Sequence, residues 1–359
     1  MKYKSITLKI GSNILTRNDG MLNVSQIAHI VDQVAALQRM GVEVIMVSSG
    51  AVAAGRGELK LNKNLDTVSA RQLYSAIGQV KLIRRYTDFL NEYDINCAQV
   101  LATKSDFSDR EHYLNMKNCI STMLENNIIP IINENDTISI SELMFTDNDE
   151  LSGMIACMQK SEALIMLSNV DGIYNGKPSN TGSTLIETIG TKDKEWMNNV
   201  SRQKSGFGRG GMLTKGSIAQ QVAKQGIDVH IANGAHKNII LDLLDSNKKV
   251  EHTTFVAQKQ NPSDVKRWLA LSNSFAKAEL IVNDGAKEAL ISEQATSLLL
   301  IGVVRIIGEF KKGDIIKIKD EKGDIIGWGK ANISSSTAQE KLGEKHKQAI
   351  IHYDYLYLK

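Results

Sequence analysis

Residues 127–149 read NIIPIINENDTISISELMFTDND, and this stretch decides both the fold and the place of the functional site. Four isoleucines lie between positions 128 and 132, and the polar run Asn133–Asp136 follows at once. A short apolar run bounded by polar residues is typical of a buried strand, and open α/β sheets bind ligands beyond the carboxyl ends of such strands. We therefore expect this end, together with residues 147–149, to hold a small polar ligand. A pair of turns rich in Asn and Asp is the simpler alternative.

The order of strand, polar turn and helix recurs on both sides of this stretch. Strands are expected over residues 6–10, 42–47, 95–101, 163–167 and 227–232. Helices are expected over residues 25–41 (capped by Ser25), 69–89, 109–125, 151–158 and 215–224, and a loop over residues 55–66. Repeated β–α order predicts an α/β domain with a mostly parallel sheet sandwiched by helices.

Four of the expected strands end in polar residues. These ends carry Lys9, Ser49, Asn133–Asp136 and Ser168–Asn169. One polar strand end is an ordinary surface feature or a tight turn. Because the carboxyl ends of parallel strands lie at one edge of a sheet, four such ends indicate a site.

A glycine-rich segment, residues 206–215, reads GFGRGGMLTK. It formally matches GxGxxG, but a dinucleotide fingerprint needs a hydrophobic strand directly before it, and here NVSRQKS precedes it. Backbone amides without Cβ crowding, a helix N-terminus and an ammonium group suit a polyphosphate. A surface loop is the alternative.

Composition excludes several classes of protein. The 359 residues include 43 basic and 40 acidic ones, a formal charge of +3, so no strong attraction to nucleic acid or to anionic lipid is implied. Three cysteines in apolar sequence fit neither a disulfide framework nor a metal site, and we expect buried thiols. The polar N-terminus and the lack of an apolar run near 18 residues predict a cytoplasmic protein without a membrane span.

The chain changes character near residues 261–262, an Asn-Pro pair that breaks regular structure. Short β-like runs separated by Gly-Asp and Lys-Gly turns follow. We expect an α/β domain over residues 1–255, a linker over 256–275, and a small β domain over 276–359.

Five ordered motifs now identify a family resemblance. They are LKIGSNILT (8–16), SSGAVAAG (48–55), INENDT (132–137), TDND (146–149) and GRGGMLTK (208–215). Together they resemble the amino acid kinase family, most closely the members that phosphorylate the γ-carboxylate of L-glutamate at the start of proline biosynthesis. The C-terminal segment resembles a PUA domain, a β-barrel-like module. The resemblance implies the amino acid kinase fold over residues 1–255 and a PUA domain over residues 276–359.

The resemblance also implies roles for particular residues. Lys9 and Lys215 match the lysines that flank the transferred phosphoryl group, and Asp149 matches the aspartate that orients both. The residues that match the glutamate site are Ser49, Asp136 and Asn148, with Asn133 beside them. Those that match the ATP site are Lys9, Ser168, Asn169, Arg209, Gly210, Gly211, Met212, Leu213, Thr214 and Lys215. Mg²⁺ is expected to bridge the ATP phosphates, with no side chain predicted as a metal ligand.

Two residues depart from the family pattern. Asn169 stands where many members have aspartate, and Arg209 where threonine is common, so nucleotide affinity is the property in question. The resemblance further implies inhibition by proline, a homodimer or homotetramer, and transfer of the product to glutamyl phosphate reductase. Residues 276–359 hold 13 basic and 12 acidic residues, which disfavours RNA binding, although Lys311-Lys312 could form a local patch. An RNA-binding module on an inactive kinase fold and an amino-acid sensor are the alternative functions.

Overall fold

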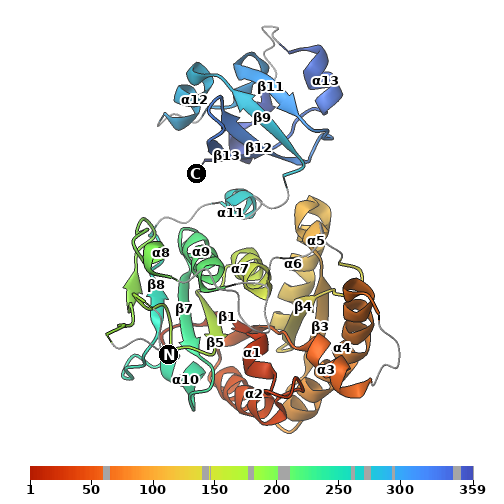
Figure 1. The fold of residues 1–359 in the computed structure, drawn as a ribbon, viewed down its shortest axis with the longest axis vertical. Helices are drawn as coiled ribbons and strands as arrows, with labels where there is room; N and C mark the ends of the chain where they lie inside the picture. The colour runs from red at the N-terminus through yellow and green to blue at the C-terminus, as the bar shows by residue number, and fades with distance from the viewer. Residues whose placement is uncertain are drawn as a thin grey trace. The chain divides into compact units, whose positions relative to one another are not determined.

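The computed structural model describes residues 1–59, 65–139, 145, 147–176, 182–200, 211–259, 263–270, 276–292, 296–342 and 349–358. The chain divides into two compact units, shown in Figure 1. The first comprises residues 1–103 and 115–261, and the second comprises residues 104–114 and 262–359. The expected boundaries at 255 and 276 stay a prediction.

The first unit is built on an eight-stranded sheet in the order β3-β4-β2-β1-β5-β7-β8-β6. Every neighbouring pair in it is parallel except β7 and β8. The strands are β1 (Ser5–Ile10), β2 (Glu43–Val47), β3 (Cys97–Ala102), β4 (Ile129–Glu134), β5 (Ala163–Ser168), β6 (Thr188–Ile189), β7 (Asp228–Asn233) and β8 (Thr253–Phe255). The expected mostly parallel sheet is confirmed.

Helices cover both faces of this sheet, as Figure 1 shows. Helix α2 packs against β2 on one face, whereas α7 packs against β1 and α9 against β7 on the other. The helices of the unit are α1 (Ser12–Leu15), α2 (Val24–Arg39), α3 (Ala51–Glu58), α4 (Thr67–Asn91), α6 (Arg110–Glu125, its first residues in the second unit), α7 (Asn148–Gln159), α8 (Trp196–Asn199), α9 (Met212–Ala223) and α10 (Ile239–Leu244).

The pleat of β1 decides which residues enter the core and which reach the site. Ile6, Leu8 and Ile10 are fully buried in the cluster that α2, α4 and α10 share. Because side chains alternate along a strand, Thr7 and Lys9 point to the opposite face, where α7 lies. The alternation in SITLKI therefore directs one lysine out of the apolar core and towards α7.

The structure corrects three local expectations. Asn23, not Ser25, caps α2, because its side chain accepts a hydrogen bond from the backbone N–H of Gln26. The expected loop over residues 55–66 begins inside α3, which continues to Glu58. Cys119 is exposed on α6 and Cys97 is half-buried, so the expectation of three buried thiols is confirmed only for Cys157.

The second unit contains a five-stranded sheet in the order β11-β9-β12-β13-β15 and a β10-β14 pair. Its strands are β9 (Ala278–Val282), β10 (Leu298–Leu299), β11 (Val303–Ile307), β12 (Ile315–Asp320), β13 (Ile325–Lys330), β14 (Ala349–Ile351) and β15 (Leu356–Leu358). Its helices are α5 (Lys104–Ser108), α11 (Asp264–Ala270), α12 (Asp284–Ile291), α13 (Ser335–Glu340) and the 3₁₀ turns η3 (Leu300–Gly302) and η4 (Tyr353–Tyr355). The expected β-rich character is confirmed, and the short helices were not expected.

Residues far apart in the sequence meet within the second unit. The indole N–H of Trp268, on α11, donates to the carbonyl oxygen of Phe107, on α5, at 2.6 Å. Arg110 lies over the rings of Tyr113 and Trp268. These contacts explain why residues 104–114 cluster with the C-terminal residues. In the described ranges, no helix has both the length and the apolar character needed to cross a membrane.

Candidate active site

The polar ends of β1, β2, β4 and β5 meet at one edge of the first sheet, beside the N-termini of α7 and α9. Lys9 is the fifth residue of β1, Asp149 the second of α7 and Lys215 the fourth of α9. Asp147 caps α7, since its carboxylate accepts from the backbone N–H of Asp149 at 2.9 Å. This cap fixes the first turn of α7 and with it the direction of Asp149.

Two lysines share one buried carboxylate. Lys9 Nζ lies 2.5 Å from Asp149 Oδ1. Lys215 Nζ donates to both oxygens of the same carboxylate at 2.7 Å. The exposed fractions are 4% for Lys9, 1% for Asp149 and 8% for Lys215, so all three groups lie away from bulk water. Sequence positions 9, 149 and 215 are thus brought into a single cluster, as the resemblance predicted.

The pKa shifts of these groups follow from burial and from one another. Burial alone would raise the pKa of Asp149, but the two ammonium groups hold it far below its ordinary value. Burial alone would lower the pKa of Lys9, but the charges of Asp149 and Asp147 raise it. Burial lowers the pKa of Lys215, because Asp149 does not fully compensate and Lys9 repels the same ammonium. The cluster therefore holds two ammonium groups around the ionised Asp149, with Asp147 as a second carboxylate 3.7 Å from Lys9.

Asn148, the first residue of α7, links the ends of β2 and β4. Its amide nitrogen lies 2.7 Å from the Ser48 carbonyl oxygen, 2.9 Å from Ser49 Oγ and 3.0 Å from Asn133 Oδ1. Its own Oδ1 is buried, and in the described part of the chain nothing donates a hydrogen bond to it. A buried acceptor without a partner costs about 1–3 kcal/mol. An N–H group of a bound ligand would remove that cost.

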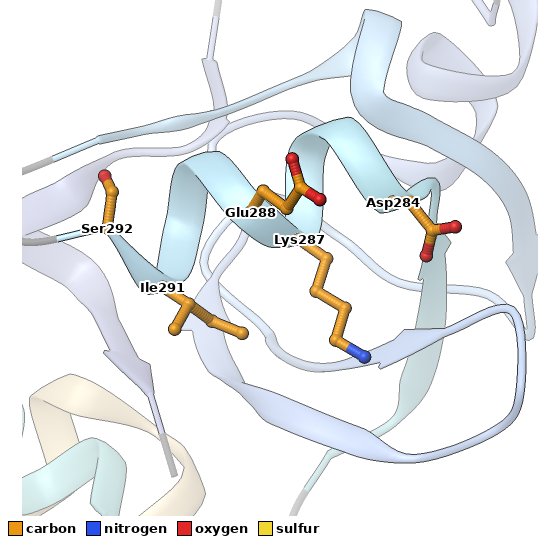
Figure 2. A pocket seen from close by; sticks show the side chains of 5 residues that line it. All are labelled: Asp284, Lys287, Glu288, Ile291 and Ser292. Carbon is orange, nitrogen blue, oxygen red and sulfur yellow. The ribbon is translucent and has the colours of Figure 1, made fainter.

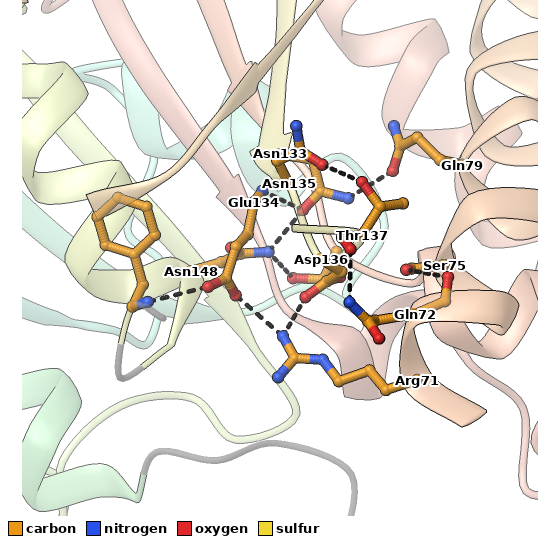
Figure 3. A network of polar contacts seen from close by, with 12 residues as sticks. Arg71, Gln72, Ser75, Gln79, Asn133, Glu134, Asn135, Asp136, Thr137 and Asn148 are labelled. Carbon is orange, nitrogen blue, oxygen red and sulfur yellow. Dashed lines mark hydrogen bonds and ion pairs between the residues drawn. The ribbon is translucent and has the colours of Figure 1, made fainter. Parts of the chain in front are cut away.

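A polar network surrounds the end of β4, as Figure 3 shows. The Asn133 amide donates to Gln79 Oε1 at 2.8 Å, and Arg71 forms ion pairs with both Glu134 and Asp136. Burial raises the pKa of Asp136, and burial together with the charge of Asp136 raises the pKa of Glu134 to about 7. The structure therefore brings Ser49, Asn133, Asp136 and Asn148 to one edge of the sheet.

The residues that α4 contributes to this edge of the sheet were not expected from the sequence. Arg71, Gln72, Ser75 and Gln79 lie on the side of the helix that faces β4, and three of them contact it or the turn after it. Their spacing of one, four and eight residues places them on one face of a helix, a signal visible in the sequence. This spacing indicates a polar face on the helix, but it does not indicate which strand or loop packs against that face.

The expected nucleotide residues are only partly described. Ser168 ends β5 and is 9% exposed, and its carbonyl oxygen accepts from the backbone N–H of Gly234 at 2.8 Å. Asn169 is exposed beside it. Gly211 caps α9, and Met212, Leu213 and Thr214 form its half-buried first turn. Arg209 and Gly210 lie outside the described residues, so their expected roles stay predictions.

The described residues contain no group of three or more His, Cys, Asp or Glu side chains arranged to hold a metal ion. Asp149 is already engaged by two ammonium groups. Mg²⁺ commonly binds through substrate phosphates and one or two carboxylates rather than in an all-protein cage.

A surface depression of about 410 Å³ lies on α12 of the second unit. Figure 2 shows its lining, which alternates acidic and basic groups: Asp284, Lys287, Glu288, Ile291 and Ser292. Lys287 is paired with Asp320 at 2.6 Å. Such a mixed lining offers no concentrated charge to an anionic ligand.

Comparison with known proteins agrees with the fold. The amino acid kinase family model matches residues 4–233, and the PUA domain model matches residues 278–353. The chain is 52% identical over 357 residues to a glutamate 5-kinase of Bacteroides thetaiotaomicron, covering 99% of both chains. It is 46% identical over 357 residues to a glutamate 5-kinase of Chlorobaculum tepidum, covering 99% of this chain and 98% of that protein. A glutamate 5-kinase of Streptococcus pneumoniae is 37% identical over 357 residues, which are 99% of this chain and 96% of that protein.

Proposed function

The chain belongs to the amino acid kinase family, and on this basis we propose that it phosphorylates L-glutamate. The reaction transfers the γ-phosphoryl group of ATP to the γ-carboxylate of L-glutamate. Its products are L-glutamyl 5-phosphate and ADP, and it is the first step of proline biosynthesis. The observation that carries the proposal is the buried pair of lysines on Asp149, in a chain 52% identical to a glutamate 5-kinase along 357 residues.

The chemistry needs no general base. A γ-carboxylate is already ionised at neutral pH, so one of its oxygens attacks the γ-phosphorus directly. A bond forms between that oxygen and phosphorus, and the bond to the β,γ-bridging oxygen breaks, which releases ADP. Catalysis then consists of positioning and of stabilising charge on the transferred group and on the leaving oxygen.

Lys9 and Lys215 supply that stabilisation. Both ammonium groups are buried, where electrostatic interactions are stronger than in water. Asp149 holds them at fixed positions, so they need little reorganisation when charge develops. Because the two lysines keep Asp149 ionised and fully hydrogen-bonded, this carboxylate orients the lysines and does not accept a proton.

The amino-acid site lies at the end of β4. Asp136 provides a carboxylate for the α-ammonium group of glutamate, and Asn148 Oδ1 is a buried acceptor that a substrate N–H would satisfy. Ser49 and Asn133 hold the Asn148 amide in place. The described arrangement supports these four residues as the glutamate site.

The nucleotide site is assigned to the ends of β5 and the start of α9. The N-terminus of α9 presents backbone N–H groups that suit the phosphates of ATP. Lys9, Ser168, Asn169 and the segment 209–215 complete the proposed site. Mg²⁺ enters with ATP and neutralises phosphate charge when bound.

The family resemblance implies three further properties of the enzyme. We expect inhibition by proline, assembly into a homodimer or homotetramer, and transfer of the labile acyl phosphate to glutamyl phosphate reductase. Dependence on ATP and glutamate favours a cytoplasmic location. The near balance of charge in residues 276–359 favours a structural or regulatory role over RNA binding.

One assay tests the activity. ADP release with Mg²⁺ and L-glutamate is measured, and glutamyl phosphate is trapped as the hydroxamate with hydroxylamine. Aspartate and N-acetylglutamate are the comparison substrates. Turnover on either of them without turnover on glutamate would overturn the substrate assignment while leaving the kinase assignment intact.

A further inference from the structure

One face of α4 forms a polar wall beside the end of β4, as Figure 3 shows. Gln79 accepts from the Asn133 amide at 2.8 Å, and Gln72 donates to the carbonyl oxygen of Thr137 at 2.8 Å. Arg71 is the only cation of this wall among the described residues of α4 that contact β4 or the turn after it. The helix therefore holds the Asn133 side chain before Asp136 and the Thr137 carbonyl after it, and it places one positive charge against Asp136.

Arg71 neutralises two carboxylates at once. Its Nη2 donates to Glu134 Oε2 at 3.2 Å and forms a shorter contact with Asp136 Oδ1. The exposed fractions of the side chains are 20% for Arg71, 6% for Glu134 and 12% for Asp136. Two carboxylates this close and this buried repel each other, and one of them tends to take up a proton unless a cation compensates.

The pKa shifts agree with this picture. Burial raises the pKa of Asp136, and the charge and hydrogen bond of Arg71 oppose that rise. Burial and Asp136 raise the pKa of Glu134 to about 7, again against the influence of Arg71. Among the described groups, those that act on Asp136 are Arg71 from α4 and Glu134 from β4.

We propose that Arg71 is a positioning residue of the amino-acid site, which keeps Asp136 ionised and turned towards the α-ammonium group of the substrate. The inference rests on the proposed function and adds to it a residue for which no role was expected. A protonated Asp136 would offer a neutral acid to a cation, and an Asp136 without Arg71 would lose its fixed direction.

A structural ion pair is the competing explanation. Glu134 Oε1 accepts from the backbone N–H of Phe145 at 2.9 Å, so Arg71 also supports the backbone at residue 145 through Glu134. Loss of that support would disturb the site at every pH and would affect kcat and both KM values. Loss of the charge on Asp136 would affect the KM for glutamate alone, and most strongly at low pH.

The test uses Arg71→Gln, Arg71→Lys and a matched control, Arg84→Gln. Arg84 lies on the same helix, its side chain is 81% exposed, and its ion pair with Asp88 is long, at 3.8 Å. Initial rates are measured from pH 6 to pH 9 with glutamate and MgATP varied separately. Thermal unfolding of each variant shows whether it is folded.

We expect Arg71→Gln to raise the KM for glutamate about 10- to 100-fold at pH 6, as befits a lost charge-assisted hydrogen bond. The increase should shrink as the pH rises, because Asp136 then ionises without help. The kcat and the KM for ATP should stay within about twofold. Arg71→Lys should recover most of the loss at pH 6, and Arg84→Gln should behave as wild type.

Two results would overturn the inference. One is an Arg71→Gln enzyme with unchanged kinetics, and the other is a loss of equal size at all pH values in kcat and in both KM values. A wild-type enzyme that makes no hydroxamate from glutamate would instead refute the proposed function. The two failures are therefore distinguishable.

Discussion

At the residue scale, the site depends on one carboxylate that serves two ammonium groups. Replacing Lys215 by alanine leaves Asp149 still paired with Lys9, so we expect a folded protein. Turnover should fall about 10³-fold or more, by analogy with the loss of other cationic groups in phosphoryl transfer. The measurement is the glutamate-dependent rate together with a thermal melt. A rate within tenfold of wild type would exclude the proposed role of Lys215.

Asp149→Asn is the informative contrast, because it removes the carboxylate that pairs with Lys215 and leaves Lys9 only the more distant Asp147, at 3.7 Å. Removing one partner of a buried ion pair costs about 3–5 kcal/mol. We therefore expect this variant to lose both activity and stability, whereas Lys215→Ala loses activity alone. Urea unfolding of the two variants separates the effects. Equal stability of the two would mean that Asp149 is not the shared counter-ion that the distances indicate.

A second residue-scale prediction concerns the buried side chain of His230 on β7. It is 1% exposed, and its ring nitrogens contact Tyr3 Oη at 2.9 Å and Thr254 Oγ1 at 3.2 Å. Burial and the neighbouring His252 lower its pKa to about 3. Below about pH 6.5 the unfolded chain takes up a proton that the folded chain refuses. Stability from this group is therefore present above pH 6.5 and lost as the pH falls, by about 1.4 kcal/mol per pH unit.

The measurement is the free energy of unfolding of wild type and His230→Gln at pH 7.5, 6.5 and 5.5. Glu134 acts in the opposite direction, since its raised pKa favours the folded state at lower pH, but it is common to both proteins. The difference in free energy of unfolding between wild type and His230→Gln should therefore become smaller from pH 6.5 to pH 5.5. A difference that does not change with pH would show that His230 is not held neutral.

Among single residues, the sequence predicted best those in the polar runs that end or follow an expected strand. The strand pattern around Lys9 and the polar run that contains Asp149 each predicted a residue at the site. Their contact with Lys215 was predicted only by the family resemblance. Arg71 could not be predicted, because nothing near it in the sequence indicates that α4 covers the end of β4. Its partners Glu134 and Asp136 lie more than 60 positions away.

At the element scale, close packing of α3 on α4 positions two elements that border the proposed amino-acid site. Helix α3 begins beside Ser49, and α4 carries the residues that contact β4. The helices approach so closely that a Cβ added at Gly78 would lie 1.7 Å from the Ala51 carbonyl oxygen. One added at Gly55 would lie 1.9 Å from the Tyr74 carbonyl oxygen. Glycine is required here for space rather than for backbone angle.

Gly78→Ala should therefore separate the two helices. We expect a loss of about 3 kcal/mol of stability, at the upper end for overpacked cores, and a higher KM for glutamate with little change in the KM for ATP. Gly57→Ala is the control, since an added Cβ there meets only the Met21 side chain at 3.7 Å. In a helix it should be neutral or stabilising by about 0.5–1 kcal/mol. Similar behaviour of the two variants would contradict the proposed close contact.

The same glycines explain the main error at the element scale. Hydrophobic periodicity predicted α2, α4, α6 and the inner strands to within a few residues, because burial of one face leaves its period in the sequence. Gly55 and Gly57 instead favoured a loop where α3 continues. Gly55 lets α4 pack closely against α3. Close packing between two helices leaves no pattern in the sequence next to the glycine.

At the scale of the whole molecule, the sequence predicted two domains of different character. It did not predict which residues belong to each compact unit. Residues 104–114 join the C-terminal unit through contacts such as that of Phe107 with Trp268. These residues lie inside the region matched by the amino acid kinase model, at 4–233. A boundary predicted from sequence composition cannot reveal that residues 104–114 belong to the second unit, because Phe107 and Trp268 are 161 positions apart.

The last prediction concerns the charge of the second unit. Phosphate contacts from lysine and arginine dominate nucleic-acid affinity, but several lysines of this unit already face carboxylates. Lys277 pairs with Asp314 at 2.9 Å, and Lys319 pairs with Glu279 at 2.6 Å. We therefore expect the full chain to bind a structured RNA no more tightly than about 1 μM at physiological salt, within the range of non-specific binding.

Filter binding at 50 and 200 mM salt measures both the affinity and its salt dependence. We expect the plot of log binding constant against log salt concentration to have the shallow slope of one or two phosphate contacts, because most positive charges of the unit are paired with carboxylates. Lys311→Glu combined with Lys312→Glu tests the one basic pair that the sequence analysis singled out, and it should leave kinase activity unchanged. Nanomolar binding with a steep salt slope, abolished by this double variant, would establish the C-terminal unit as an RNA-binding domain. It would then add a nucleic-acid partner to an enzyme whose proposed chemistry lies wholly in the first unit.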